Sequence, residues 1–212
     1  MTITPSPDDT LLFPIGHYMG AFHPSAGAKV RSHDLRIGDH PEQLEPTQEF
    51  PIWALCHGLP DQVDNQPWTR AVVERAATQA GIRKPDQVID ELLNRKVLVE
   101  VAPNVDAAVA FASAYRVQPL FLGLGNLPDD PTQYGIGLFG RPLAVVSSFA
   151  YDLWKWAHLA DSLWHACQVF ADVAAEDEEG QEETNPDRIL AMFLQLLHPL
   201  LARNVIYLDQ VV

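Results

Sequence analysis

The sequence predicts a protein of the α+β class, mainly helical with short strands, in which one structural unit occurs twice. Its landmarks are a glycine followed closely by a proline, two tryptophans, and a Pro-Asp pair. They recur in the same order in both halves of the chain, at a nearly constant offset of about 100 residues, which is typical of an internal duplication. The pairs are Gly38 and Gly140, Trp53 and Trp154, Trp68 and Trp164, and Pro85 and Pro186.

Residues 1–28 are predicted to form an N-terminal arm or loop. They are rich in proline, glycine and histidine and show no sustained hydrophobic period, apart from one short strand expected near residues 18–22. A first domain is expected at residues 29–103. It begins with a strand over residues 29–37, where polar and apolar side chains roughly alternate.

Three helices and a strand are expected to complete the first domain. The first helix ends before the breaker at residues 58–60, and the second carries an apolar stripe from Trp68 to Ala80. The third helix begins at Pro85 and places four apolar residues on one face. The β-branched run at residues 97–101 then predicts a strand.

Residues 104–131 are predicted to link the domains, through a helix over 104–118 and a loop rich in glycine, proline and aspartate over 123–131. The second domain, residues 132–212, is expected to contain a strand near 134–139 and helices from about Ser148, about Ser162 and Pro186. Pro199 is expected to kink or break the last helix. The acidic run at 175–184 repels itself, which predicts a solvated or disordered loop.

The expected order of a strand, three helices and a strand is that of a winged helix. The segment Leu92-Leu-Asn-Arg-Lys-Val-Leu-Val99 resembles the end of the third helix in the winged helix-turn-helix superfamily, and residues 37–53 resemble its entry into the first helix. The resemblance covers about residues 30–103, and with the repeat it implies two tandem winged-helix-like domains. In that superfamily the third helix reads DNA, or the domain binds proteins when this helix lacks a basic face.

Composition argues against a protein that depends on phosphate contacts. The net charge is −14, and both halves are acidic: residues 1–103 have 9 Lys and Arg against 14 Asp and Glu, and residues 104–212 have 5 against 14. Proteins that bind nucleic acid usually carry a basic face. The N-terminus does not resemble a signal peptide and the apolar runs are too short to span a bilayer, which predicts a cytoplasmic protein. The excess of Arg over Lys and the abundance of Ala, Val and Pro indicate a bacterial source.

No motif predicts catalysis, a cofactor or a metal. The letters of G-x-G-x-x-G occur at residues 135–140, but Arg141-Pro142 follows where a dinucleotide site needs a helix, so a β-hairpin is expected there. The histidines lack the tight spacing of metal ligands, and the two cysteines provide no disulfide framework. Because no nucleophile can be paired with a base, we expect no enzyme.

We therefore expect a non-catalytic regulatory or adaptor protein that binds a protein or peptide partner. Its candidate aromatic surface consists of Tyr151 and Trp156. The alternative is a DNA-binding transcriptional regulator, acting as a homodimer. The candidate surface for DNA or a partner consists of Arg70, Arg75, Arg83, Lys84, Arg95 and Lys96.

Overall fold

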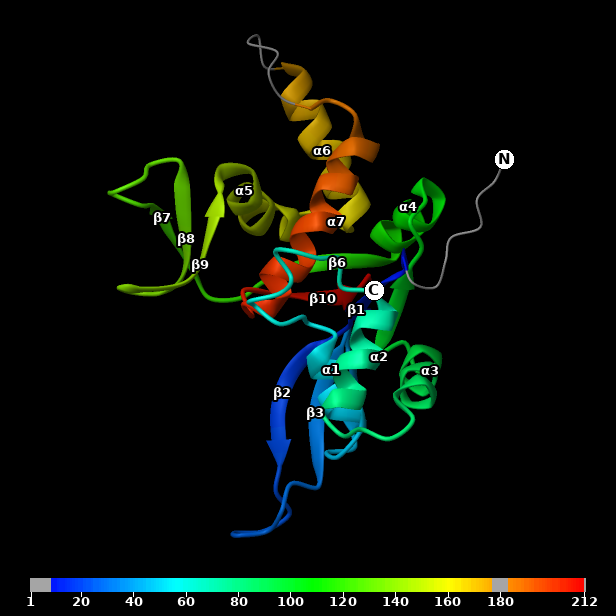
Figure 1. Ribbon diagram of the computed structural model, residues 1–212. Coiled ribbons are helices and arrows are strands. Elements are labelled where there is room, and N and C mark those ends of the chain that lie inside the picture. The colour runs from blue at the N-terminus through cyan, green and yellow to red at the C-terminus, as the bar shows by residue number, and fades with distance from the viewer. Residues whose placement is uncertain (1–8, 177–182, 212) are drawn as a thin grey trace. The chain divides into compact units, whose positions relative to one another are not determined.

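The computed structural model describes residues 9–176 and 183–211 and confirms the α+β class (Figure 1). The chain divides into two compact units. Unit 1 comprises the described residues up to Asn104 together with Leu208–Gln210. Unit 2 runs from Val105 to Tyr207 and includes Val211.

Unit 1 is built from short antiparallel strands and three helices. Its three-stranded sheet has the order β2-β3-β4, and β1 pairs with β5 in a separate two-stranded sheet. The elements are β1 Leu11–Pro14, β2 His17–Phe22, β3 Ser32–Ile37, β4 His40–Leu44, α1 Glu49–Leu55, α2 Arg70–Gln79, α3 Pro85–Asn94 and β5 Leu98–Val101.

Unit 2 adds one helix at its start and otherwise has a similar order of elements. Its three-stranded sheet has the order β7-β8-β9, and β6 pairs with β10. The elements are α4 Val105–Ala114, β6 Tyr115–Pro119, β7 Leu122–Asn126, β8 Gln133–Leu138, β9 Arg141–Ser147, α5 Ser148–Trp156, the 3-10 helix η2 Ala157–Leu159, α6 Leu163–Glu176, α7 Pro186–Ala202 and β10 Ile206–Gln210.

The two units share local irregularities as well as element order. The pairing register shifts between Tyr18 and Gly20 in unit 1 and between Gly123 and Gly125 in unit 2. Glycines with positive φ turn the next hairpin, Gly38 at 57° and Gly140 at 71°. Proline occupies the first turn of both α3 and α7, where its missing N–H costs nothing.

The first tryptophan of each unit anchors its helix to the backbone of its own unit. The Nε1 group of Trp53 in α1 donates to the Ile15 carbonyl at 3.1 Å. The Nε1 group of Trp154 in α5 donates to the carbonyls of Leu120, at 3.3 Å, and Val205, at 2.9 Å. The second tryptophans differ, since Trp68 is buried ahead of α2 whereas Trp164 lies in the first turn of α6 and is half-buried.

Residues 9–28 differ from the expected arm because they contain β1, whereas β2 matches the short strand expected near residues 18–22. Leu12, Phe13 and Ile15 are fully buried. The apolar run is only four residues long, which is too short to show a period, and its pairing partner β5 follows more than 80 residues later. The remaining residues of the expected arm, 1–8, lie outside the described part of the chain.

Four further expectations in unit 2 need correction. The linking helix ends at Ala114 instead of residue 118, and the glycine-rich segment expected as a loop begins with β7. Residues 175 and 176 of the expected acidic loop are the last residues of α6, while 177–182 lie outside the described residues. Finally, α7 continues through Pro199 to Ala202, because the proline lies near the helix end, next to buried leucines that hold the last turn in place.

Candidate functional site

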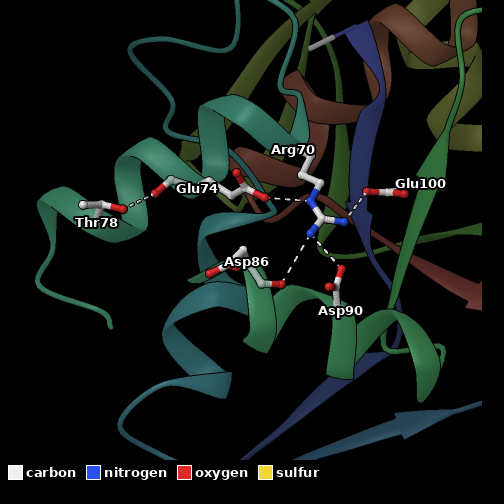
Figure 2. A network of polar contacts seen from close by, with 6 residues as sticks. All are labelled: Arg70, Glu74, Thr78, Asp86, Asp90 and Glu100. Atoms are coloured by element: carbon white, nitrogen blue, oxygen red, sulfur yellow. Dashed lines mark hydrogen bonds and ion pairs between the residues drawn. The ribbon is translucent and has the colours of Figure 1, made fainter. Parts of the chain in front are cut away.

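The expected basic surface of unit 1 loses Arg70 to an internal network (Figure 2). Its guanidinium bonds Glu74 at 2.7 Å in α2, Asp90 at 2.7 Å in α3 and Glu100 at 3.1 Å in β5. It also donates to the Asp86 carbonyl at 3.4 Å. Burial alone would lower the pKa of Arg70, but the hydrogen bonds to the three carboxylates outweigh it and raise the pKa. Arg70 therefore ties three elements together, and its charge is balanced by three carboxylates of the same unit.

Arg95 is engaged in the same manner. It donates to Glu42 at 2.8 Å in β4, to Glu49 at 2.9 Å in α1 and to the Gln43 carbonyl at 2.8 Å. Burial opposes the charge, whereas bonds to both carboxylates raise the pKa of Arg95. Because two carboxylates balance the charge of Arg95, its attraction for an anion outside the protein is weakened.

Of the six basic residues predicted to form this surface, Arg70 and Arg95 are thus paired with carboxylates of the same unit. The four other basic residues of that prediction are exposed: Arg75, Arg83, Lys84 and Lys96. Exposed carboxylates of α3 lie among them in the sequence, at Asp86, Asp90 and Glu91. A groove-reading helix with this charge pattern would repel phosphate.

The expected aromatic pair is also separated. Tyr151 and Trp156 both belong to α5, but five helical residues turn a side chain by about 140°. Tyr151 stacks on Tyr134, with ring centroids 4.8 Å apart. Trp156 is 48% exposed, and the Lys155 ammonium lies 4.5 Å from its ring centroid. Trp156 also lines a cavity.

That cavity is an apolar groove of about 460 Å³ in unit 2, which we call the α6 groove. It is formed by the end of α5, by η2 and by one face of α6. Its lining residues are Trp156, Leu159, Ala160, His165, Ala166, Val169, Phe170 and Val173.

Local sequence explains why this face of α6 stays open. The other side of the helix is occupied by small buried residues, Cys167, Ala171 and Ala174 among them, which allow close packing in the core. Val169 and Val173 lie one turn apart on the groove side and are 43% and 62% exposed. Leu159, in η2, is 68% exposed. Large apolar side chains clustered in this way mark an interaction site more often than a single exposed residue does.

One edge of the α6 groove carries carboxylates. Asp161 precedes the helix, is 93% exposed at its side chain and lies 3.6 Å from the His165 ring nitrogen. Asp172 and Glu176 are exposed and follow His165 at intervals of seven and eleven residues, which places all three on one line along the helix. The groove thus has an apolar floor and an acidic edge.

Comparisons of the chain with protein-family models, with curated proteins and with solved structures gave no match. The site therefore rests on its geometry alone. Sequence reasoning identified Trp156 but missed Leu159, Val169 and Val173. A signal was present, since α6 has bulky apolar residues on one side and alanines on the other, a pattern that leaves one apolar face without a core role.

Other reactive groups provide no alternative site. Burial raises the pKa of the Cys167 thiol to about 12, and it raises that of Cys56 further, so both remain protonated. Within residues 9–176 and 183–211, no group of three or more His, Cys, Asp or Glu side chains is placed to hold one metal ion. No helix in that part of the chain has the length and apolar character needed to span a membrane. The G-x-G-x-x-G letters fall in the β8–β9 hairpin, as expected.

Proposed function

We propose that this chain is a non-catalytic regulatory or adaptor protein of the bacterial cytoplasm that binds a protein or peptide partner in the α6 groove. The observation that carries the proposal is the gathering of four large, half-exposed apolar side chains around one cavity: Trp156, Leu159, Val169 and Val173. Burying each against a partner would contribute about 1 kcal/mol.

The spacing of the apolar residues in the α6 groove suits a helical segment. An amphipathic helix binds a groove through apolar residues spaced three and four apart, and the groove floor offers Val169 and Val173 at that spacing. The aromatic ring of Trp156 supplies the kind of side chain that dominates binding energy at protein interfaces.

We further propose that the two units are diverged copies of one winged-helix-like domain. The support is the recurrence of three helices with a three-stranded antiparallel sheet, and of the hairpin glycines and anchoring tryptophans. The acidic face of α3 and the internal pairing of Arg70 and Arg95 favour protein binding over DNA binding.

Site-directed photo-crosslinking in cells of the source organism tests the proposal. A photoreactive phenylalanine analogue at position 169 is expected to yield a discrete covalent adduct. The matched control carries the same photoreactive analogue in place of Val105, an exposed residue of α4, and is expected to yield no adduct. Adding Leu159→Glu should abolish the adduct at 169. Identical adducts from both positions, or none from position 169, would overturn the proposal.

A further inference from the structure

We propose that the segment bound in the α6 groove is a cationic amphipathic helix, an inference that rests on the proposed function of the groove. Such a helix presents apolar residues to the floor of the groove and lysine or arginine to its acidic edge. The assignment follows from three observations: the line of carboxylates on α6, its length, and the charge of the surrounding sequence.

The carboxylates lie where a bound helix would place its flanking residues. Val169 and Val173 define the floor, and Asp172 and Glu176 lie beside them on the edge also occupied by His165. The side chains of Asp172 and Glu176 are exposed, so each carboxylate can meet a cation of the partner without first losing a buried contact. Charges arranged in this way select a partner and speed its association.

The acidic edge has the length of a short helix. Eleven residues separate His165 from Glu176, which corresponds to about 16 Å at the rise of an α-helix. A partner helix lying along α6 would therefore match the edge with basic residues spread over about three turns. Asp161, which precedes α6, adds a carboxylate 3.6 Å from the His165 ring nitrogen at the start of this line.

The described charges along the α6 groove are mostly negative. From residue 156 to residue 176 the sequence has three carboxylates, Asp161, Asp172 and Glu176, and no Lys or Arg. Lys155 is the basic side chain at the tryptophan end, where it lies over the Trp156 ring. Along the acidic edge of the groove, an acidic partner would be repelled and a neutral partner would gain no electrostatic attraction. A basic partner would be attracted by each carboxylate.

Fluorescence anisotropy with four labelled peptides of about 18 residues tests the inference. The peptides are an amphipathic Leu/Lys helix, its Leu/Glu and Leu/Gln counterparts, and a scrambled Leu/Lys sequence with the same charge and no apolar face. We expect the amphipathic Leu/Lys peptide to bind at least tenfold more tightly than the other three at about 50 mM salt, and to lose much of this advantage at about 300 mM.

Two pairs of matched variants locate the binding. Asp172→Asn combined with Glu176→Gln should weaken binding of the Leu/Lys peptide by about 2- to 10-fold, as expected for two exposed charges. Glu91→Gln combined with Asp129→Asn changes the net charge equally and should have little effect, since both residues lie outside the groove. Val169→Glu should reduce binding of the neutral Leu/Gln peptide, whereas Val105→Glu should not.

The outcomes separate this inference from the proposed function. If the Leu/Gln peptide binds through Val169 and the Leu/Lys peptide binds no better, the groove binds helices but its partner is not cationic. If the scrambled peptide binds as tightly as the amphipathic one, or if both carboxylate pairs have equal effects, the attraction is general and the inference fails. If no peptide binds, the proposed helix-binding groove fails with it.

Discussion

The phenol oxygen of Tyr151 occupies the space that a side chain at Gly123 would need. A Cβ at residue 123 would overlap that oxygen and would also lie 3.1 Å from the Trp154 ring. In unit 1 the position before the equivalent register shift is Tyr18, whose ring lies 5.4 Å from that of Phe50 in α1. The tyrosine ring therefore comes from the sheet in unit 1 and from the helix in unit 2, where the sheet residue that it meets is a glycine.

Gly123→Ala is expected to lower the free energy of unfolding by about 2 kcal/mol, because the added methyl group overpacks a rigid aromatic stack. Urea denaturation measures the change. Tyr151→Phe removes the overlapping oxygen, so the double variant should regain part of the loss. An additive result in the double-mutant cycle would contradict the proposed contact.

Arg70→Ala is expected to destabilise the protein by about 1–2 kcal/mol, because Glu74, Asp90 and Glu100 then repel one another without their shared cation. The loss should shrink at high salt, which screens the repulsion. Arg75→Ala, at an exposed position of the same helix, is the control and should change stability by less than about 0.5 kcal/mol. Equal effects of the two variants would show that the network is not stabilising.

Acid should destabilise the protein partly through His57. Burial lowers the pKa of His57 from its usual 6.5 to about 4, even though its ring nitrogen bonds the Trp53 carbonyl at 3.1 Å. The unfolded chain therefore takes up the proton first, and the stability contributed above pH 6.5 is lost as the pH falls toward 4.

Chemical denaturation between pH 7 and pH 4 measures this contribution. His57→Gln removes the titration, so its stability should fall by about 1–2 kcal/mol less than that of the unaltered chain across this range. His40→Gln, at an exposed turn, should leave the pH profile unchanged. If the free energy of unfolding depends on pH in the same way in His57→Gln and in the unaltered chain, His57 does not contribute to the acid sensitivity.

Asp209 is expected to be the most sensitive carboxylate of unit 1. It is 1% exposed, accepts from the Gly38 backbone N–H at 2.7 Å and pairs with Arg36 at 3.3 Å. Asp209→Ala should cost about 3 kcal/mol, because the part-buried Arg36 guanidinium loses its carboxylate and the Gly38 amide loses its acceptor. Asp39→Ala, in the same turn but exposed, serves as the control in thermal unfolding and should have little effect. A small shift for Asp209→Ala would contradict this role.

Several parts of the fold could be predicted because their signals are local. Gly38 and Gly140 need positive φ in tight turns, and Pro85 and Pro186 fit the first turn of a helix, whatever the rest of the chain does. Strand β1 could not be predicted, because Leu11 pairs with Val101 and so depends on a distant segment. The candidate site was also predictable only in part. Trp156 could be recognised from the sequence as an aromatic residue without a counterpart in the repeat, whereas Leu159, Val169 and Val173 were missed.

By itself the sequence determined the α+β class, the acidic charge, the turns and the starts of the helices, because short-range sterics and composition decide these features. Only the tertiary structure decided which charges and apolar faces remain available. Arg70 and Arg95 are distant in sequence from most of their carboxylates, so their neutralisation depends on packing. Val169 and Val173 are exposed because the opposite side of α6, with its small residues, is the one that packs into the core, and only the packed fold shows how much of each side chain is left uncovered.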